Sequence, residues 1–240
     1  MIRLRSTALL LAGGLSLAAC SQPAAPAPAS ADPKAALTAS IAGLTAGNYA
    51  YTVAMDDMQV TGTTDFPSAS AAWSTTFTDA EPEVIDERVI GEDKYSRKTR
   101  DAPWEHLDLS RMPEAVARQG LTITKPDRTG ATQLIGMVDS ATMDGPTIRG
   151  RLAVTKTIGG GIATQPLEFR LEGARPTFTA TVDDQGRLSR LVVDVPAATA
   201  PPEPAGAWTL DVTGYGTTPT PTRPTPTKEA PEDRYEITGT

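Results

Sequence analysis

His106 is the only histidine of the chain, so any histidine-dependent chemistry must use it. A Ser/His/Asp hydrolase site needs a nucleophile on a recognisable turn, and no Gly-x-Ser-x-Gly pattern accompanies this histidine. A metal cluster needs several ligands, which one histidine does not supply. The run Trp104-Glu105-His106-Leu107-Asp108 alternates as an edge strand does. We therefore interpret Trp104 and His106 as structural residues.

Three acidic or glycine-rich segments bear only a partial likeness to ligand-binding loops. Asp183-Asp184-Gln185-Gly186 lacks the further ligands and the closing glutamate of a calcium loop, and predicts a hairpin turn. Gly159-Gly160-Gly161 has no following Lys-Ser/Thr, which excludes a phosphate loop and favours a flexible strand connection. Asp56-Asp57 fits a solvated turn, and nothing selects a catalytic carboxylate pair among the many acids. We expect no enzyme, no metal site and no cofactor.

Cys20, the sole cysteine, follows a segment typical of export signals. Arg3 and Arg5 give a positive start, and the apolar stretch Ala8 to Ala18 is too short to span a bilayer. The segment Leu17-Ala18-Ala19-Cys20 resembles the lipobox of bacterial lipoproteins. That resemblance implies cleavage before Cys20, a diacylglyceryl thioether on its sulfur and often a third acyl chain. The alternative is an ordinary signal peptide followed by a chance cysteine.

A lipid anchor on Cys20 predicts that residues 1–19 are a lipoprotein signal peptide and that the rest of the chain is a body tethered to the membrane. Two or three acyl chains on one residue suffice for stable anchoring. Residues 20–33 are rich in Pro and Ala and predict an extended linker. Residues 34–216 suit one globular domain. Residues 217–240 form a Thr/Pro-rich acidic tail, which we interpret as a solvated extension or as an acceptor of O-linked sugars.

The charge of the chain restricts its partners. The formal net charge is -7, and removal of Arg3 and Arg5 with the signal peptide makes the mature chain still more acidic. An acidic surface disfavours nucleic acid as a partner. Hydrophobic residues make up 39% of the chain, which is enough for a core, and aromatic residues make up only 5%. We therefore expect a packed body held off the membrane.

The first element of the body is a well-signalled helix. Asp32 is a suitable cap, Pro33 fits the first turn and Gly47 is a suitable end. Three apolar residues share one face of this helix: Leu37, Ile41 and Leu44. A second short helix is predicted from Thr129 to Val138, with Asp127 as its cap and an inward face of Leu134, Ile135 and Val138. A third is predicted from Met112 to Gln119.

The remaining segments favour strands, because apolar and polar residues alternate between turn signals. The clearest hairpin joins Thr177 to Val182 with Arg187 to Val195 through the turn 183–186. The other expected strands are residues 49–55, 58–64, 72–78, 84–90, 94–99, 147–157, 167–171 and 208–213. A leading helix, a run of strands and a short helical insertion predict an α+β fold with an antiparallel sheet.

Four segments taken together resemble a known family. They are Val89-Ile90-Gly91-Glu92-Asp93-Lys94-Tyr95, Pro103 to Asp108, Asp183 to Asp194 and Asp211 to Gly216, preceded by the lipobox. Their order and spacing are similar to those of the LppX/LprG-like lipoproteins of actinobacteria, in the LolA/LolB-like superfamily. The resemblance implies a strongly curved antiparallel half-barrel with helices packed on its concave side and an apolar cavity for acyl chains. One departure is that residues 217–221 are polar and proline-broken where the family has a final strand.

The resemblance implies a function in the cell envelope, on the outer face of the cell membrane. Members of the family bind or move lipids and glycolipids. The candidate cargo-binding residues of this chain are then the apolar residues of the two helices: Leu37, Ile41, Leu44, Leu134 and Val138. The alternative is a non-enzymatic binding or regulatory module with a closed core and an envelope protein as partner. A continuous apolar cavity favours the first hypothesis, and a filled core favours the second.

Overall fold

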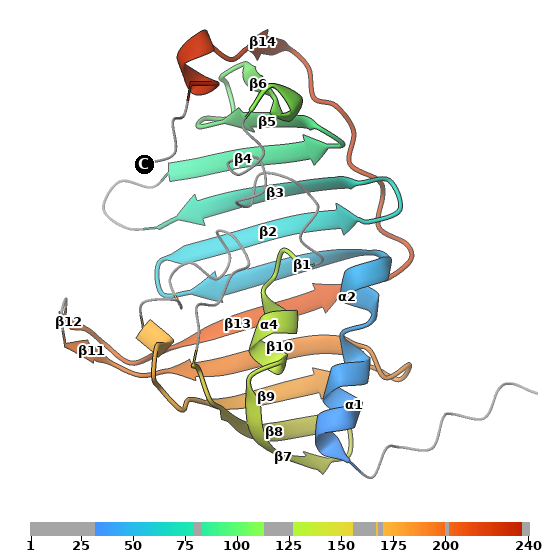
Figure 1. Cartoon of the computed structure of the whole chain (residues 1–240), viewed down its shortest axis with the longest axis vertical. Coiled ribbons are helices and arrows are strands. Elements are labelled where there is room, and N and C mark those ends of the chain that lie inside the picture. Colours follow the sequence, from blue (N-terminus) through green and yellow to red (C-terminus); the bar gives the residue numbers. More distant parts are fainter. Residues whose placement is uncertain are drawn as a thin grey trace, which may run out of the picture.

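One large antiparallel sheet dominates the structure (Figure 1). The computed structural model describes residues 32–78, 83–112, 127–155, 167, 170–199 and 202–236. Twelve strands form an open sheet in the order β14-β6-β5-β4-β3-β2-β1-β13-β10-β9-β8-β7, and β11 and β12 form a separate two-stranded pair. The described helices are few and short. The α+β class predicted from the strand periodicity is therefore confirmed at this level.

The first half of the sheet is a meander in which consecutive strands pair. Its strands are β1 (Asn48–Met55), β2 (Met58–Asp65), β3 (Ser70–Phe77), β4 (Glu83–Ile90), β5 (Asp93–Arg97) and β6 (Trp104–Asp108). Apolar and polar residues alternate along β1, which has a strictly alternating burial pattern. This half follows the predicted strands to within a few residues.

The second half is a meander that returns to the first strand. Its strands are β7 (Val138–Asp144), β8 (Thr147–Leu152), β9 (Thr177–Val182), β10 (Leu188–Val195) and β13 (Gly206–Thr213), with β11 (Ala198–Thr199) and β12 (Pro202–Glu203) between the last two. The last long strand lies beside the first, with Ala50 opposite Thr213 and Ala54 opposite Thr209. The predicted hairpin between β9 and β10 is confirmed.

The Thr/Pro-rich segment after β13 stays with the sheet instead of leaving it. Residues 214–226 run along one side of the sheet, at the right in Figure 1, and end beside its upper edge. There β14 (Thr227–Glu229) pairs with β6 in parallel. The short helix η2 (Glu232–Arg234) follows. We call residues 214–236 the strap; a freely solvated extension does not describe them.

The predicted first helix is present but divided into two. α1 (Pro33–Ser40) begins at Asp32, whose side chain accepts a hydrogen bond from the Lys34 backbone N–H at 3.0 Å. After a short break, α2 (Gly43–Ala46) carries Leu44 and ends at Gly47, as expected. Both helices lie on one face of the sheet together with α4 (Ala131–Ile135) (Figure 1).

Three predictions about secondary structure are corrected. The second helix is shorter than expected, so Val138 begins strand β7 and does not belong to the inward face of a helix. Residues 167, 170 and 171 are helical where a strand was predicted, because a four-residue spacing of Leu167 and Leu171 also fits a helix turn. The helix predicted from Met112 lies outside the described residues, except that Met112 itself is buried after η1 (Leu109–Arg111).

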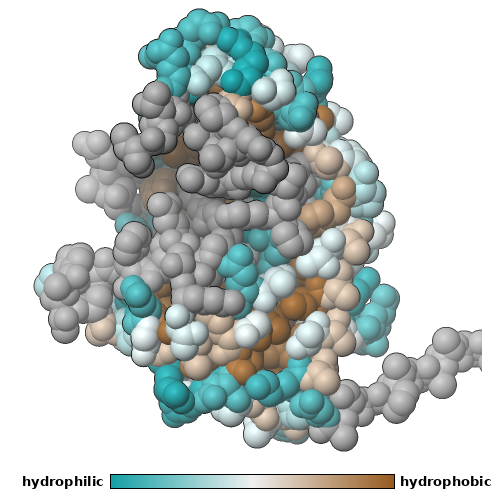
Figure 2. Space-filling view, in the orientation of Figure 1, coloured by the Kyte–Doolittle hydropathy of each residue, from teal (hydrophilic) through white to brown (hydrophobic). Residues whose placement is uncertain are grey.

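The hydrophobic core lies on the face of the sheet that carries the helices, which we call the inner face. Register places Val53, Leu210 and Leu191 side by side across three central strands. The other buried apolar residues of this face include Tyr49, Tyr51, Val60, Ala71, Val89, Ile148, Phe178, Ala180, Val193, Trp208 and Val212. Figure 2 shows hydrophobic residues gathered on this side, between hydrophilic upper and lower ends.

Candidate functional site

The structure brings the expected cargo-binding residues of the helices into one core with the sheet. Leu37, Leu44 and Leu134 have no exposed surface, and Ile41 is also buried. All four belong to the same hydrophobic cluster as the inner face. Val138 packs against this cluster only partly buried, from strand β7. Cys20 lies outside the described residues.

A polar group that the sequence analysis did not identify interrupts the inner face at β3, β4 and β5. The Trp73 indole N–H donates to Glu87 Oε2 at 2.8 Å. Lys94 Nζ lies 2.7 Å from Glu87 Oε1, and both side chains are less than a fifth exposed. One carboxylate therefore serves an indole and an ammonium group on a face that is otherwise mainly apolar.

Arg128, just before α4, extends over this group. Its guanidinium carbon lies 4.3 Å from the centre of the Trp73 ring. Burial lowers the pKa of Arg128, while the nearby Tyr51 and Glu87 act in the opposite direction. The Nε and Nη2 atoms are inaccessible to solvent and have no hydrogen-bond partner in the structure. The side chain as a whole is half-buried.

The backbone around Arg128 is fixed by its neighbour. Asp127, which the sequence predicts as a cap, accepts hydrogen bonds from the backbone N–H groups of Thr129 at 2.8 Å and Thr132 at 2.7 Å. The Thr129 hydroxyl donates to the same carboxylate at 2.6 Å. Gly130 adopts a φ of 76°, a left-handed conformation that glycine accepts without strain. This turn holds Arg128 against the inner face.

A cluster of tyrosines lies next to this group on the inner face. The Tyr49 ring is 6.2 Å from that of Tyr51 and 5.9 Å from that of Tyr215. Burial raises the pKa values of Tyr49 and Tyr51, so both phenols stay protonated and uncharged. The Tyr51 ring covers Gly62, where a Cβ atom would come within 2.5 Å of it. Glycine at position 62 thus makes room for the tyrosine.

The opposite, outer face carries a polar groove of about 870 Å³ over β1 to β6. Small side chains of Ala, Ser and Thr form its floor. At one end two guanidinium groups contact the Trp104 ring, with the guanidinium carbons of Arg88 at 5.0 Å and of Arg97 at 4.5 Å from its centre. Arg97 is paired with Asp86 at 2.8 Å, which leaves this end only partly neutralised. Trp104 is buried, as a structural residue would be.

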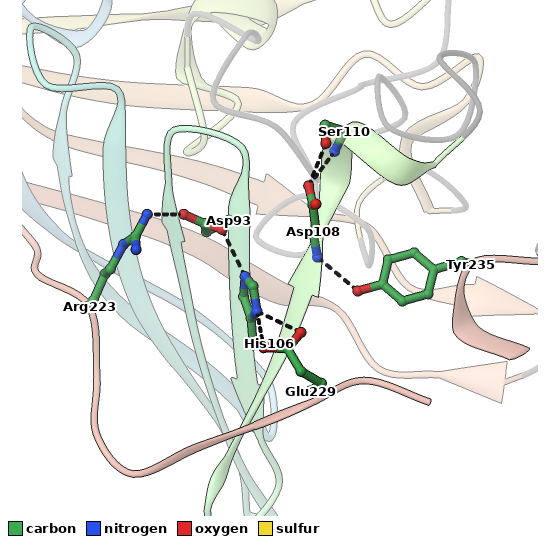
Figure 3. A network of polar contacts seen from close by, with 7 residues as sticks. All are labelled: Asp93, His106, Asp108, Ser110, Arg223, Glu229 and Tyr235. Atoms are coloured by element: carbon green, nitrogen blue, oxygen red, sulfur yellow. Dashed lines mark hydrogen bonds and ion pairs between the residues drawn. The ribbon is translucent and has the colours of Figure 1, made fainter. Parts of the chain in front are cut away.

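His106 is the only histidine and would be needed for any histidine-dependent chemistry. In the structure it joins the strap to the sheet (Figure 3). Its Nδ1 lies 2.9 Å from Glu229 Oε1, and its Nε2 lies 2.8 Å from Asp93 Oδ1. Asp93 also accepts a hydrogen bond from Arg223 of the strap. The Tyr235 hydroxyl accepts from the Asp108 backbone N–H at 3.1 Å. Every member of this network has a structural partner, which agrees with a structural histidine.

The rest of the described chain adds no metal cluster and no membrane-spanning helix. Within the described ranges, no three side chains of His, Cys, Asp or Glu are grouped so that they could hold a metal ion. No helix in the same ranges is both long and apolar enough to cross a bilayer.

Comparison with known proteins identifies no family. No family model matches the chain, and no curated protein matches it. Among solved structures, a DnaN sliding clamp (DNA polymerase III subunit beta) from Pseudomonas aeruginosa bound to griselimycin has 9% sequence identity and a TM-score of 0.17. A second Pseudomonas aeruginosa sliding clamp has 8% identity and a TM-score of 0.16. The alignments cover 75% and 76% of this chain, which spans 61% of each clamp.

Proposed function

We propose that this chain is a membrane-anchored extracytoplasmic lipoprotein that binds lipid or glycolipid on the inner face of its sheet. The observation that carries the proposal is the large apolar cluster on that face, into which Leu37, Leu44 and Leu134 are buried. Among the described residues no second sheet covers this apolar face, and in the proposal helices and cargo share that role. Cys20 supplies the anchor.

The resemblance to LppX/LprG-like lipoproteins supports the same proposal. In that family the sheet is a curved half-barrel, the helices pack on its concave side, and acyl chains fill the space between. The helices α1, α2 and α4 lie on a single face of the present sheet (Figure 1), as that architecture requires. In the proposed arrangement, an acyl chain lies between the sheet and two segments: the break between α1 and α2, which carries Ile41, and α4, which carries Leu134.

Acyl chains fit the chemistry of this face. Small and medium apolar side chains such as Ala71, Val89 and Ala180 line this face, and acyl chains pack well against such side chains. Each methylene buried there contributes about 0.8 kcal/mol and needs no polar partner. An empty apolar cavity costs about 24 cal/mol per Å³, so a filled state is favoured over an empty one.

The test is binding by the body without its anchor, purified from its own host. Native mass spectrometry and solvent extraction should reveal a co-purified lipid, and a lipid with a fluorescent acyl chain should bind. Ile41→Trp and Leu134→Phe should reduce this binding while preserving the sheet spectrum. A matched exposed change on α1, Thr38→Phe, should leave binding unaltered. A body that carries no lipid and binds none contradicts the proposal and favours the alternative of a closed core with a protein partner.

A further inference from the structure

The guanidinium group of Arg128 has one edge without a partner. Its Nε and Nη2 atoms are buried and make no hydrogen bond. These two N–H groups point in parallel from the same edge of the planar group, at the spacing of two oxygens of a carboxylate or phosphate. Proteins seldom leave buried charged donors unpaired, because their hydration is lost without replacement. The edge is therefore arranged for an acceptor that comes from outside the fold.

The two acids nearest to Arg128 in the structure are engaged elsewhere. Both oxygens of Glu87 are occupied, one by the Trp73 indole at 2.8 Å and the other by Lys94 at 2.7 Å. Both oxygens of Asp127 accept hydrogen bonds from the turn before α4, at 2.7 and 2.8 Å. Neither carboxylate forms a hydrogen bond with Arg128. Glu87 attracts the guanidinium electrostatically, and neither acid occupies its Nε and Nη2 donors.

Trp73 fixes the orientation of the free edge. With its carbon 4.3 Å from the ring centre, the guanidinium is held by cation–π attraction on one side. Contact through the flat surface leaves the rim of N–H groups unused. Because the ring is itself held by Glu87, the guanidinium has a defined position before any ligand arrives. Preorganisation of this kind lowers the cost of binding.

Other polar atoms on the same elements also lack partners. The hydroxyl of Thr75, two residues after Trp73 on the inner face of β3, is buried without a hydrogen bond. On α4, so are the Thr132 hydroxyl and the Gln133 side-chain oxygen. Unsatisfied groups on β3, which carries Trp73, and on α4, which follows Arg128, are a second observation that favours a polar ligand group between these elements.

We infer that Arg128 binds the oxyanion of an acyl-bearing lipid, a carboxylate or a phosphate, through its Nε and Nη2 groups. This inference rests on the proposed function, because the acyl chain of the same molecule would occupy the apolar part of the inner face. The lipid is then an anionic amphiphile whose charged group is held by Arg128 beside the Trp73 ring. Neutral lipids of equal chain length bind more weakly.

The test compares ligands that differ only in charge. The body without its anchor is titrated with a fluorescent fatty acid, its methyl ester, a phosphatidic acid with the same chain, and inorganic phosphate. We expect the acid to bind about tenfold more tightly than the ester, because a bidentate charge-assisted contact is lost in the ester. The phosphatidic acid separates a lipid phosphate from a carboxylate, and inorganic phosphate shows whether the oxyanion alone suffices.

Two variants assign the discrimination to Arg128. Arg128→Gln should bind acid and ester equally, with ester binding unchanged, and Arg128→Lys should recover only part of the preference. Thermal unfolding of unliganded Arg128→Gln should show only the small loss expected for its cation–π contact with Trp73, since Nε and Nη2 have no hydrogen bond to lose; a buried structural ion pair would show a larger loss. Wild-type protein that binds acid and ester equally overturns this inference and leaves the proposed function intact. Wild-type protein that binds neither overturns both.

Discussion

The Nδ1 atom of His106 lies 2.9 Å from Oε1 and 3.0 Å from Oε2 of Glu229, a residue 123 positions later in the chain (Figure 3). His106 and Glu229 are also one of the three residue pairs that join β14 to β6, so their side-chain contact helps to fasten the strap to the sheet. Burial alone would lower the pKa of His106, but hydrogen bonds to Glu229 and Asp93 outweigh it and raise the pKa above 6.5. The clasp between strap and sheet is therefore strongest when the imidazole is protonated.

The first prediction concerns pH. A histidine whose pKa is higher in the folded protein than in the unfolded chain contributes stability that is fully present below about pH 6.5. That contribution is lost as the pH rises through the higher folded-state pKa. Because His106 is the only histidine, proton NMR of its ring should give one titration with a pKa above 6.5. Unfolding in urea should show the matching fall in stability.

Glu229→Gln should lower that pKa, because it removes one of the two carboxylates bound to the ring. Glu232→Gln is the matched control. It removes the same charge from the same strap, but Glu232 pairs with Arg111 instead of the imidazole. If both variants change the His106 titration equally, the pKa shift comes from net charge and not from the clasp.

The second prediction concerns the closest backbone approach in the sheet. A Cβ atom on Gly150 would lie 1.9 Å from the carbonyl oxygen of Ser140 and 2.8 Å from the Phe178 ring. Gly150→Ala should cost about 3 kcal/mol or more, since backbone of a paired strand has to move. Gly145 lies in the turn of the same hairpin, and a Cβ atom added there would have no other atom within 4 Å. The only strain of Gly145→Ala is that alanine has to adopt a φ of 56°. It should cost about 1 kcal/mol. Equal losses of unfolding free energy would contradict this contrast.

The third prediction concerns Arg170, which connects three segments. Its side chain is 5% exposed and lies 2.7 Å from the Asp56 carboxylate in the turn between β1 and β2. It also donates to the backbone oxygens of Pro196 and Pro204. Arg170→Met should reduce the free energy of unfolding by about 1–2 kcal/mol, because it removes charge-assisted hydrogen bonds of a buried guanidinium to acceptors that are themselves exposed to water. Asp56→Asn should cost less, since Asp56 is 40% exposed and asparagine tolerates its φ of 48°. A larger loss for Asp56→Asn would be the contrary result.

The fourth prediction concerns the anchor. Cys20→Ala removes the only thiol of the chain, so incorporation of a labelled fatty acid should be abolished. The variant should be released from the membrane fraction or stall in export. Cys20→Ser keeps a polar side chain of similar size and should behave in the same way. A parent protein that incorporates no label, together with a Cys20→Ala form that fractionates exactly like it, would rule out the lipoprotein assignment.

Strand periodicity was sufficient to predict most of the sheet from the sequence, because one buried face imposes a strict alternation on segments such as Asn48–Met55. It failed for Val138–Asp144, where Val, Ala and Met alternate with Asp, Ser and Thr too weakly to be distinguished from the end of a helix. Two strand pairings have no local signal in the sequence. They are the pairing of β1 with β13 and the pairing of β14, in the strap, with β6.

The polar group around Arg128 forms because β3, β4 and β5 pair in one particular register, which the sequence does not specify. Trp73 and Glu87 are opposite each other on β3 and β4, and Lys94 is on the next strand. The available signal is Glu87 itself, an acid between the apolar Ile85 and Val89 on the same face of β4. A charge in an apolar series indicates a buried partner, but which residue supplies it emerges only from the folded sheet.

The pairing of β1 with β13 has a consequence for the synthesis of the chain. A chain that emerges N-terminus first presents β1 early, while its partner between residues 206 and 213 arrives after most of the chain. Until then, one side of β1 is an unpaired edge bearing alternate apolar side chains, which is a template for aggregation. Because most of the chain lies between β1 and β13, closing this long loop also makes their pairing, at the centre of the sheet, a late event in folding. The incompletely synthesised protein is therefore the form that is most prone to aggregate.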